Sequence, residues 1–322
     1  MRNTLPRHAA ARRAAPAAAA LAASLAVLPA AGAHAATFFA TGQLLEPGDP
    51  AITPGQPGHD DTRSNFLYAV DTVTGRATPV GPATTGLPPA LGGTPDGRLL
   101  GFRGGQLLEL DTSNGDATAV GGPAGISAFG FDVLGDGRAF AFTTSDDALY
   151  GIDTTTGAAS LVGSAGAVNA ALAAAGATDP DAFIISLASV GDDLYGWDLD
   201  TGSLIRFAAD TGAASVVGAL GAAGRVGGGA LSGGAALTGV DEDADGRFDA
   251  LFGNVNFLNP DGPEGTVRLG GVARFDLTDG TYDIVGINEG VIFFGFGSSP
   301  VPEPGSAALA AAGALLLARR RR

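Results

Sequence analysis

The sequence of 322 residues contains no cysteine, and its 18 basic residues are all arginine. Without cysteine, neither a disulfide nor a thiolate metal ligand is available, so the fold must be held by its core alone. Of the three histidines, His8 and His34 lie in an N-terminal stretch that we expect to be removed, and His59 lies in a segment rich in Pro and Gly. Zinc chemistry, Cys-His nucleophiles and Ser-His-Asp triads therefore lack their parts.

The N-terminus has the three parts of a secretory signal peptide. Arginines give it a positive start, residues 14–31 are apolar, and Ala33-His34-Ala35 has the small-x-small pattern of a signal peptidase site. We predict a signal peptide over residues 1–35, with Ala33 and Ala35 at the cleavage site and Ala36 as the first mature residue. The pair Arg12-Arg13 leaves twin-arginine export open as an alternative to general secretion.

The C-terminus combines a short polar motif, an apolar stretch and a basic end. Residues 305–318 are fewer than the roughly 20 that a relaxed transmembrane helix needs, so a tail that is recognised and removed fits better than a permanent anchor. The basic end is expected to stay cytoplasmic, which places the body of the protein on the far side of the membrane. The predicted signal spans residues 301–322. Its polar motif and its basic end consist of Val301, Pro302, Glu303, Pro304, Arg319, Arg320, Arg321 and Arg322.

This tail resembles the PEP-CTERM sorting signal of Gram-negative bacteria. The resemblance covers residues 301–322 only. It implies processing by an exosortase and a destination at the cell surface or in the exopolysaccharide matrix, with transient membrane association through the tail. It assigns a destination and not an activity.

The part of the chain between the two signals is strongly acidic. Between Ala36 and Pro304, ten arginines face 33 acidic residues, which gives a formal charge of −23. Such a surface repels nucleic acid and anionic lipid headgroups, and it attracts divalent cations. We therefore expect no nucleic-acid partner.

A hairpin pattern occurs five times in this part of the chain. Each copy has alternating apolar residues, a turn of the Asp-x-x-Thr-Gly kind, and a short return strand that ends in Val-Gly. An acidic residue is expected to cap each turn, and we assign this position to Asp71, Asp111, Asp153, Asp210 and Asp276. The first strands of the copies begin at Leu67, Leu107, Leu149, Leu204 and Val272.

A second hairpin precedes several copies, where an Asp-Gly-Arg turn is followed by an apolar strand. Four short strands every 40 residues or so is the period of a β-propeller blade. The first copy lacks its opening strand, but residues 291–297 resemble the segment that opens the third copy. We therefore predict an all-β propeller of five four-stranded blades over residues 36–300, with the C-terminal strand completing the first blade. An open β-sandwich is the alternative.

One turn of the second kind has the oxygen ligands that calcium prefers. Asp241, Asp243, Asp245 and Asp249 stand at the first, third, fifth and ninth positions, Gly246 permits a tight turn, and the carbonyl oxygen of Arg247 is available near the seventh. The spacing resembles the calcium loops of integrin-type FG-GAP propellers, and the twelfth position, Phe252, rules out an EF-hand. The turn therefore predicts one calcium ion. A solvated acidic turn without a metal is the alternative.

The sequence favours a binding protein over an enzyme. Tyr68, Tyr150, Tyr195 and Trp197 alternate into strands and are expected in the core, and no acid pair stands out from the turn acids. We expect a non-catalytic surface or matrix protein that binds extracellular polysaccharide or another surface protein. The alternative is a polysaccharide hydrolase or lyase, which would need acids and arginines such as Arg206, Arg225 or Arg274 to converge at the axial mouth of the ring.

Overall fold

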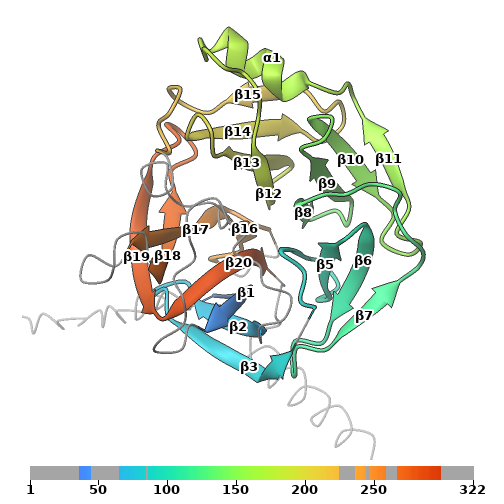
Figure 1. Ribbon diagram of the computed structural model, residues 1–322, viewed down its shortest axis with the longest axis vertical. Coiled ribbons are helices and arrows are strands. Elements are labelled where there is room, and N and C mark those ends of the chain that lie inside the picture. The colour runs from blue at the N-terminus through green and yellow to red at the C-terminus, as the bar shows by residue number, and fades with distance from the viewer. Residues whose placement is uncertain are drawn as a thin grey trace, which may run out of the picture. The chain divides into compact units, whose positions relative to one another are not determined.

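Five four-stranded antiparallel sheets surround a central axis in the computed structural model (Figure 1). The structure describes residues 36–44, 65–84, 86–224, 236–243, 247–258 and 267–298. The five sheets are the blades of a β-propeller, so the predicted fold and blade number are confirmed and the sandwich alternative is wrong.

The strands of each blade follow one another from the axis outward. Blade 1 consists of β20 (Val291–Ser298), β1 (Thr37–Leu44), β2 (Asn65–Asp71) and β3 (Ala77–Thr84), and blade 2 of β4 (Ala90–Gly93), β5 (Leu99–Arg103), β6 (Gln106–Leu110) and β7 (Ala117–Val120). Blade 3 consists of β8 (Gly130–Val133), β9 (Ala139–Thr143), β10 (Ala148–Ile152) and β11 (Ala159–Val162), and blade 4 of β12 (Ile184–Val190), β13 (Asp193–Asp198), β14 (Ser203–Ala208) and β15 (Ala214–Val216). Blade 5 consists of β16 (Leu237–Val240), β17 (Ala250–Leu258), β18 (Val267–Phe275) and β19 (Tyr282–Glu289).

The ring closes in blade 1, whose innermost strand comes from the far end of the chain. β20 pairs antiparallel with β1, with Phe38 opposite Ser298 and Leu44 opposite Val291. The neighbouring blade is tied to this strand by the side chain of Asn254, whose Nδ2 donates to the carbonyl oxygen of Phe293 at 3.1 Å. The predicted closure by the C-terminal strand is therefore confirmed.

The acidic turn residue caps its hairpin as predicted in four of the five blades. Asp71 Oδ1 accepts hydrogen bonds from the backbone N–H of Thr74 at 2.7 Å and of Val73 at 3.0 Å. Gly75 closes the turn with φ +66°, a conformation that L-residues rarely adopt. Hydrogen bonds from backbone N–H groups to a nearby side chain stabilise the turn relative to a continued strand. Asp153 makes both contacts, and Asp111 and Asp276 each accept from the N–H two residues further along the chain.

The assignment of Asp210 to this position is wrong. In blade 4 the residue that starts the turn is Ala208, whose carbonyl oxygen accepts from the N–H of Gly212 at 2.8 Å. Asp210 lies two residues later and pairs with Arg138 of blade 3 at 2.5 Å. The capping motif does occur in blade 4, but one strand earlier, where Thr201 donates to buried Asp198.

A repeated glycine joins each blade to the next at the rim. In every blade, the Gly of the Val-Gly element lies against a backbone carbonyl of the following blade. That carbonyl belongs to the residue just before the turn Gly. A Cβ added to the glycine of the Val-Gly element would overlap the carbonyl oxygen. We call this the rim contact. The glycines are Gly81, Gly121, Gly163, Gly218 and Gly286, and they face Asn114, Thr156, Thr211, Asp279 and Thr74 in that order. The last contact returns to blade 1, so the series runs around the whole ring.

The core fills the gaps between neighbouring blades with large side chains. Between blades 4 and 5, the Trp197 ring lies edge-on to Phe275, with centroids 5.2 Å apart. Phe38 packs between Phe252 of blade 5 and Phe296 of its own blade. Tyr68, Tyr195 and Trp197 are buried as expected, whereas Tyr150 is partly exposed.

The strand order gives the propeller two distinct faces. One carries the turns from first to second and from third to fourth strands, and we call it the turn face. The other carries the turns from second to third strands and the links between blades, and we call it the connection face. The helix α1 (Ala167–Ala174) belongs to the link from blade 3 to blade 4 and lies beside β15 at the rim (Figure 1). Its Val168 and Leu172 are fully buried.

Candidate functional site

The predicted calcium loop lies on the turn face and joins β16 to β17, the first and second strands of blade 5. Two hydrogen bonds fold it back on itself. The N–H of Glu242 donates to Asp249 Oδ1 at 2.9 Å, and the N–H of Asp249 donates to the carbonyl oxygen of Val240 at 2.9 Å. These bonds bring the first and last predicted ligands, Asp241 and Asp249, to the same end of the loop.

The remaining acid of this loop, Glu242, is engaged by an arginine of the same blade. Glu242 binds Arg274 of β18 through both carboxylate oxygens, with its Oε2 2.7 Å from Nη2, and this hydrogen bond raises the pKa of the guanidinium. Glu242 was not a predicted ligand. Among the described residues, no three His, Asp or Glu side chains gather as a metal site requires, and Asp245 lies outside them.

Of the arginines that an enzyme site would need, the two that the structure describes, Arg206 and Arg274, do not converge at the axis. Arg206 lies on β14 and pairs with Asp193 at 2.7 Å, and Arg274 pairs with Glu242, so each engages an acid of its own blade. Both stand on the third strand from the axis and are about half exposed. Arg225 lies outside the described residues.

The acid nearest the axis, Asp132, is enclosed by three inner strands. It lies on β8 with 2% of its surface exposed. Its Oδ2 accepts from the N–H of Ser189 on β12 at 2.5 Å, and its other oxygen lies against Gly92 of β4. Burial raises the pKa of Asp132 to about 7, although hydrogen bonds from the backbone N–H groups of Val133 and Ser189 oppose the shift. Its chemistry is that of a structural bridge between blades.

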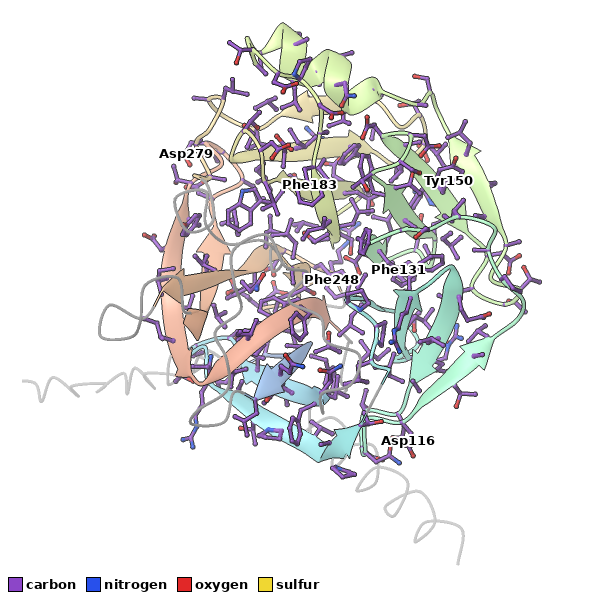
Figure 2. The ribbon with its side chains drawn as sticks, viewed as in Figure 1. Asp116, Phe131, Tyr150, Phe183, Phe248 and Asp279 are labelled. Carbon is purple, nitrogen blue, oxygen red and sulfur yellow. The ribbon has the colours of Figure 1, made fainter. Side chains whose placement is uncertain are left out.

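Two exposed phenylalanines flank the inner strands on the connection face. Phe129 precedes β8 and is 48% exposed, and Phe183 precedes β12 and is 41% exposed. Figure 2 shows Phe183 next to the inner strands of blade 4. We call these residues the mouth pair. Both are large aromatic side chains that stand exposed at the inner ends of adjacent blades.

A buried hydroxyl lies on β12, in the strand that Phe183 precedes. Gly130, next to Phe129, packs against the backbone of Ser186, which is three residues along β12 from Phe183. The hydroxyl of Ser186 is buried and has no hydrogen-bond partner. An unmet buried hydroxyl costs free energy, so it favours a hydroxyl or water as its partner.

A polar hollow of about 430 Å³ lies on the same face and includes Asp179, Asp200, Thr201 and Gly221 in its lining. It is linked to the mouth pair through Asp198, which accepts from the N–H of Phe183 at 2.8 Å and also from Thr201. Apolar rings, a buried hydroxyl and carboxylates therefore gather on the connection face around blades 3 and 4. The sequence pattern did not single out this surface, although Phe129 and Phe183 directly precede the inner strands of blades 3 and 4.

The sorting and cleavage residues lie outside the described residues. These are Ala33 and Ala35 at the N-terminus, and Val301, Pro302, Glu303, Pro304 and Arg319 to Arg322 at the C-terminus. Within the part of the chain that the structure describes, no helix has the length and apolar character to cross a bilayer.

No protein-family model matches the sequence, and no curated protein matches it either. Solved structures resemble it weakly. A symmetrical protein studied for its de novo evolutionary emergence is 13% identical with a TM-score of 0.45, and the match covers 82% of this chain and 98% of that one. Virginiamycin B lyase from Staphylococcus aureus is 12% identical with a TM-score of 0.36, covering 76% and 73%. Hydrazine synthase from Kuenenia stuttgartiensis is 14% identical with a TM-score of 0.33, covering 74% and 69%. Structural similarity this distant says nothing about the activity of this protein.

Proposed function

We propose that this protein is an exported, non-catalytic propeller that binds extracellular polysaccharide at the bacterial surface or in the matrix. The observation that carries the proposal is the mouth pair. Aromatic rings offer a large, rigid apolar area with a low entropy cost, and a pyranose ring has an apolar face that can stack on such a ring. The carboxylates of the nearby hollow supply hydrogen-bond acceptors for sugar hydroxyls.

The non-catalytic part of the proposal is supported by the state of the acids and arginines. The pKa of Asp132 is in the range of a general acid, which favours the alternative of a hydrolase or lyase. However, a catalytic acid must touch its substrate, and Asp132 is enclosed by backbone on three sides. The half-exposed arginines are each engaged by one acid of their own blade.

The destination of the protein is part of the same proposal. Signal peptidase removes residues 1–35, and an exosortase processes the tail at residues 301–322 in a Gram-negative bacterium. The chain contains the residues that each step requires, and the strongly acidic body suits a soluble protein outside the cell. Another surface protein is the second kind of partner that this destination allows.

Calcium belongs to the proposal as a stabiliser of the loop between β16 and β17. Asp241, Asp243, Asp245 and Asp249 would supply carboxylate oxygens and Arg247 its carbonyl oxygen, in the hard oxygen shell that calcium prefers. The hydrogen bond from Glu242 to Asp249 supports it, because it already holds the loop closed.

The mouth pair is tested by co-sedimentation of the protein with exopolysaccharide from its own bacterium. The variant that combines Phe129→Ala with Phe183→Ala is expected to bind at least about tenfold more weakly, which corresponds to about 1.4 kcal/mol. The matched control combines Val73→Ala with Leu161→Ala, two side chains that are 58% and 51% exposed and lie away from the mouth. An equal loss of binding in both variants, or no loss in either, would show that the mouth pair is not the binding surface.

A further inference from the structure

The two ends of the described propeller lie at one place. Phe38 and Ser298 are opposite each other in the β1–β20 pair, so the start of the one strand meets the end of the other. The residue before β1, Ala36, is held in the same blade, since its carbonyl oxygen accepts from the N–H of Thr72 at 3.1 Å. Thr72 belongs to a turn between third and fourth strands, so both ends lie on the turn face, on the two strands nearest the axis.

The tail leaves the propeller through a short tether. Residues 299–304 separate Ser298 from the apolar stretch that begins at Gly305. At 3.3 to 3.6 Å per residue, six residues reach about 20 Å even when fully extended. A folded domain of this size has a radius of gyration of about 18 Å. A tether attached near the axis of the turn face is therefore too short to pass around the rim and hold the opposite face against a bilayer.

Electrostatic repulsion acts against bringing the turn face close to the membrane, but its range is too short to prevent it. The turn face carries exposed carboxylates, among them Asp111, Asp153, Asp276 and Asp279. Anionic headgroups repel these groups, but salt screens the repulsion beyond about 10 Å, which is shorter than the tether. The turn face therefore stands off the membrane by several ångströms and does not adsorb to it.

We infer that the tail presents the propeller with its turn face toward the membrane and its connection face toward the extracellular matrix. The mouth pair and the polar hollow then point outward, where a polymer can reach them. This orientation rests on the proposed function for the role of the tail and for the glycan as ligand. The orientation adds that the connection face is the binding surface while the chain is held at the membrane.

Because the sequence contains no cysteine, a single introduced cysteine is the only site for a thiol-reactive label. Gly135 lies in the turn from first to second strands of blade 3, and Ser145 lies in the turn from its second to third strands, so the two residues flank opposite ends of β9. Both are exposed. Gly135→Cys and Ser145→Cys therefore place the only thiol of the full chain on opposite faces of one blade, in otherwise identical proteins.

Each variant is expressed as the full chain in a Gram-negative host that lacks an exosortase, and spheroplasts are treated with a maleimide. A small reagent is expected to label both. A maleimide carried on a bead whose diameter exceeds the length of the tether is expected to label Ser145→Cys and to leave Gly135→Cys almost unlabelled. In detergent, the two chains should react equally with both reagents.

Equal labelling of the two variants by the bead on spheroplasts would overturn the orientation, and so would failure of the membrane to retain the full chain. The readout does not depend on a sugar. If the orientation is found and the mouth-pair variant still binds exopolysaccharide like the parent, the orientation stands and the proposed function fails. If the mouth pair binds polysaccharide but both faces label equally, the proposed function stands and the orientation fails.

Discussion

The side chain of Asn288 reaches from the last strand of blade 5 to the turn between the third and fourth strands of blade 1. Its Nδ2 donates to the carbonyl oxygen of Gly75 at 2.9 Å, and its Oδ1 accepts from the N–H of Ala77 at 2.9 Å. One amide therefore satisfies two backbone groups 211 and 213 residues away in the chain. Together with the strand pair β1–β20, it closes the ring at the rim as well as at the axis.

Replacing this amide should weaken the closure. Asn288→Ala leaves the N–H of Ala77 and the carbonyl oxygen of Gly75 without a partner in a partly buried place, and we expect it to lower the free energy of unfolding by about 2 kcal/mol. Urea unfolding of residues 36–300 measures the change. Asn114→Ala is the control, because Asn114 Oδ1 accepts only a local hydrogen bond from Asp116 in an exposed turn. A loss no larger than that of the control would show that this bridge is unimportant.

The rim contact makes a second prediction about stability. Gly286 has no unusual φ, so Gly286→Ala tests only the overlap of a new Cβ with the carbonyl of Thr74. We expect a loss of about 2 kcal/mol, in the range of overpacked sites. In Gly151→Ala, a strand position of blade 3, the new Cβ would have its nearest neighbour at 3.5 Å. Thermal unfolding should show Gly151→Ala close to the parent, and similar melting temperatures for the two variants would contradict tight packing at the rim.

Asp132 predicts an unusual pH dependence of stability. Its pKa is raised to about 7 in the folded protein from the ordinary value of 3.8, so the folded state binds the proton more tightly than the unfolded state. Its contribution is therefore fully present below pH 3.8 and is lost as pH rises through 7, at up to about 1.4 kcal/mol per pH unit between the two values. Asp147 shifts in the same direction, so the comparison needs a variant. Asp132→Asn should flatten the fall in unfolding free energy between pH 5 and 8 relative to the parent; an unchanged profile would mean that Asp132 does not titrate there.

The calcium loop predicts a metal-dependent melting temperature. Millimolar calcium should raise the melting temperature of the parent, and the double variant Asp243→Ala, Asp245→Ala should lose this response. Glu242→Gln is the matched control, since Glu242 is engaged by Arg274 and is not a predicted ligand. It should keep the response. A parent that is unaffected by calcium or chelator would sink the metal assignment.

The repeat allowed the fold to be predicted in unusual detail. Each blade carries its own strands and turn signals, and the resemblance of residues 291–297 to the start of blade 3 located the closing strand. The error at Asp210 arose because blade 4 carries the capping motif at Asp198, between its second and third strands, and only a degenerate copy one strand later. A spacing pattern alone does not distinguish these two places.

The candidate site was less predictable, for a physical reason. Whether Phe129 and Phe183 are exposed, and whether Asp132 is buried, depends on how the inner strands of three blades approach one another. The Val-Gly elements were visible as a period, but their contact with the turn of the next blade was not. Such relationships join residues that are distant in the chain, and no local pattern encodes them.

The central claim is that the propeller binds polysaccharide without cleaving it. The most direct test incubates residues 36–300 with the exopolysaccharide of the producing bacterium, with calcium and with chelator, and measures the protein in the pellet and the soluble sugar in the same supernatant. We predict that the protein is retained in the pellet with no release of sugar. Release of oligosaccharide that grows with time would contradict the account and identify an enzyme instead.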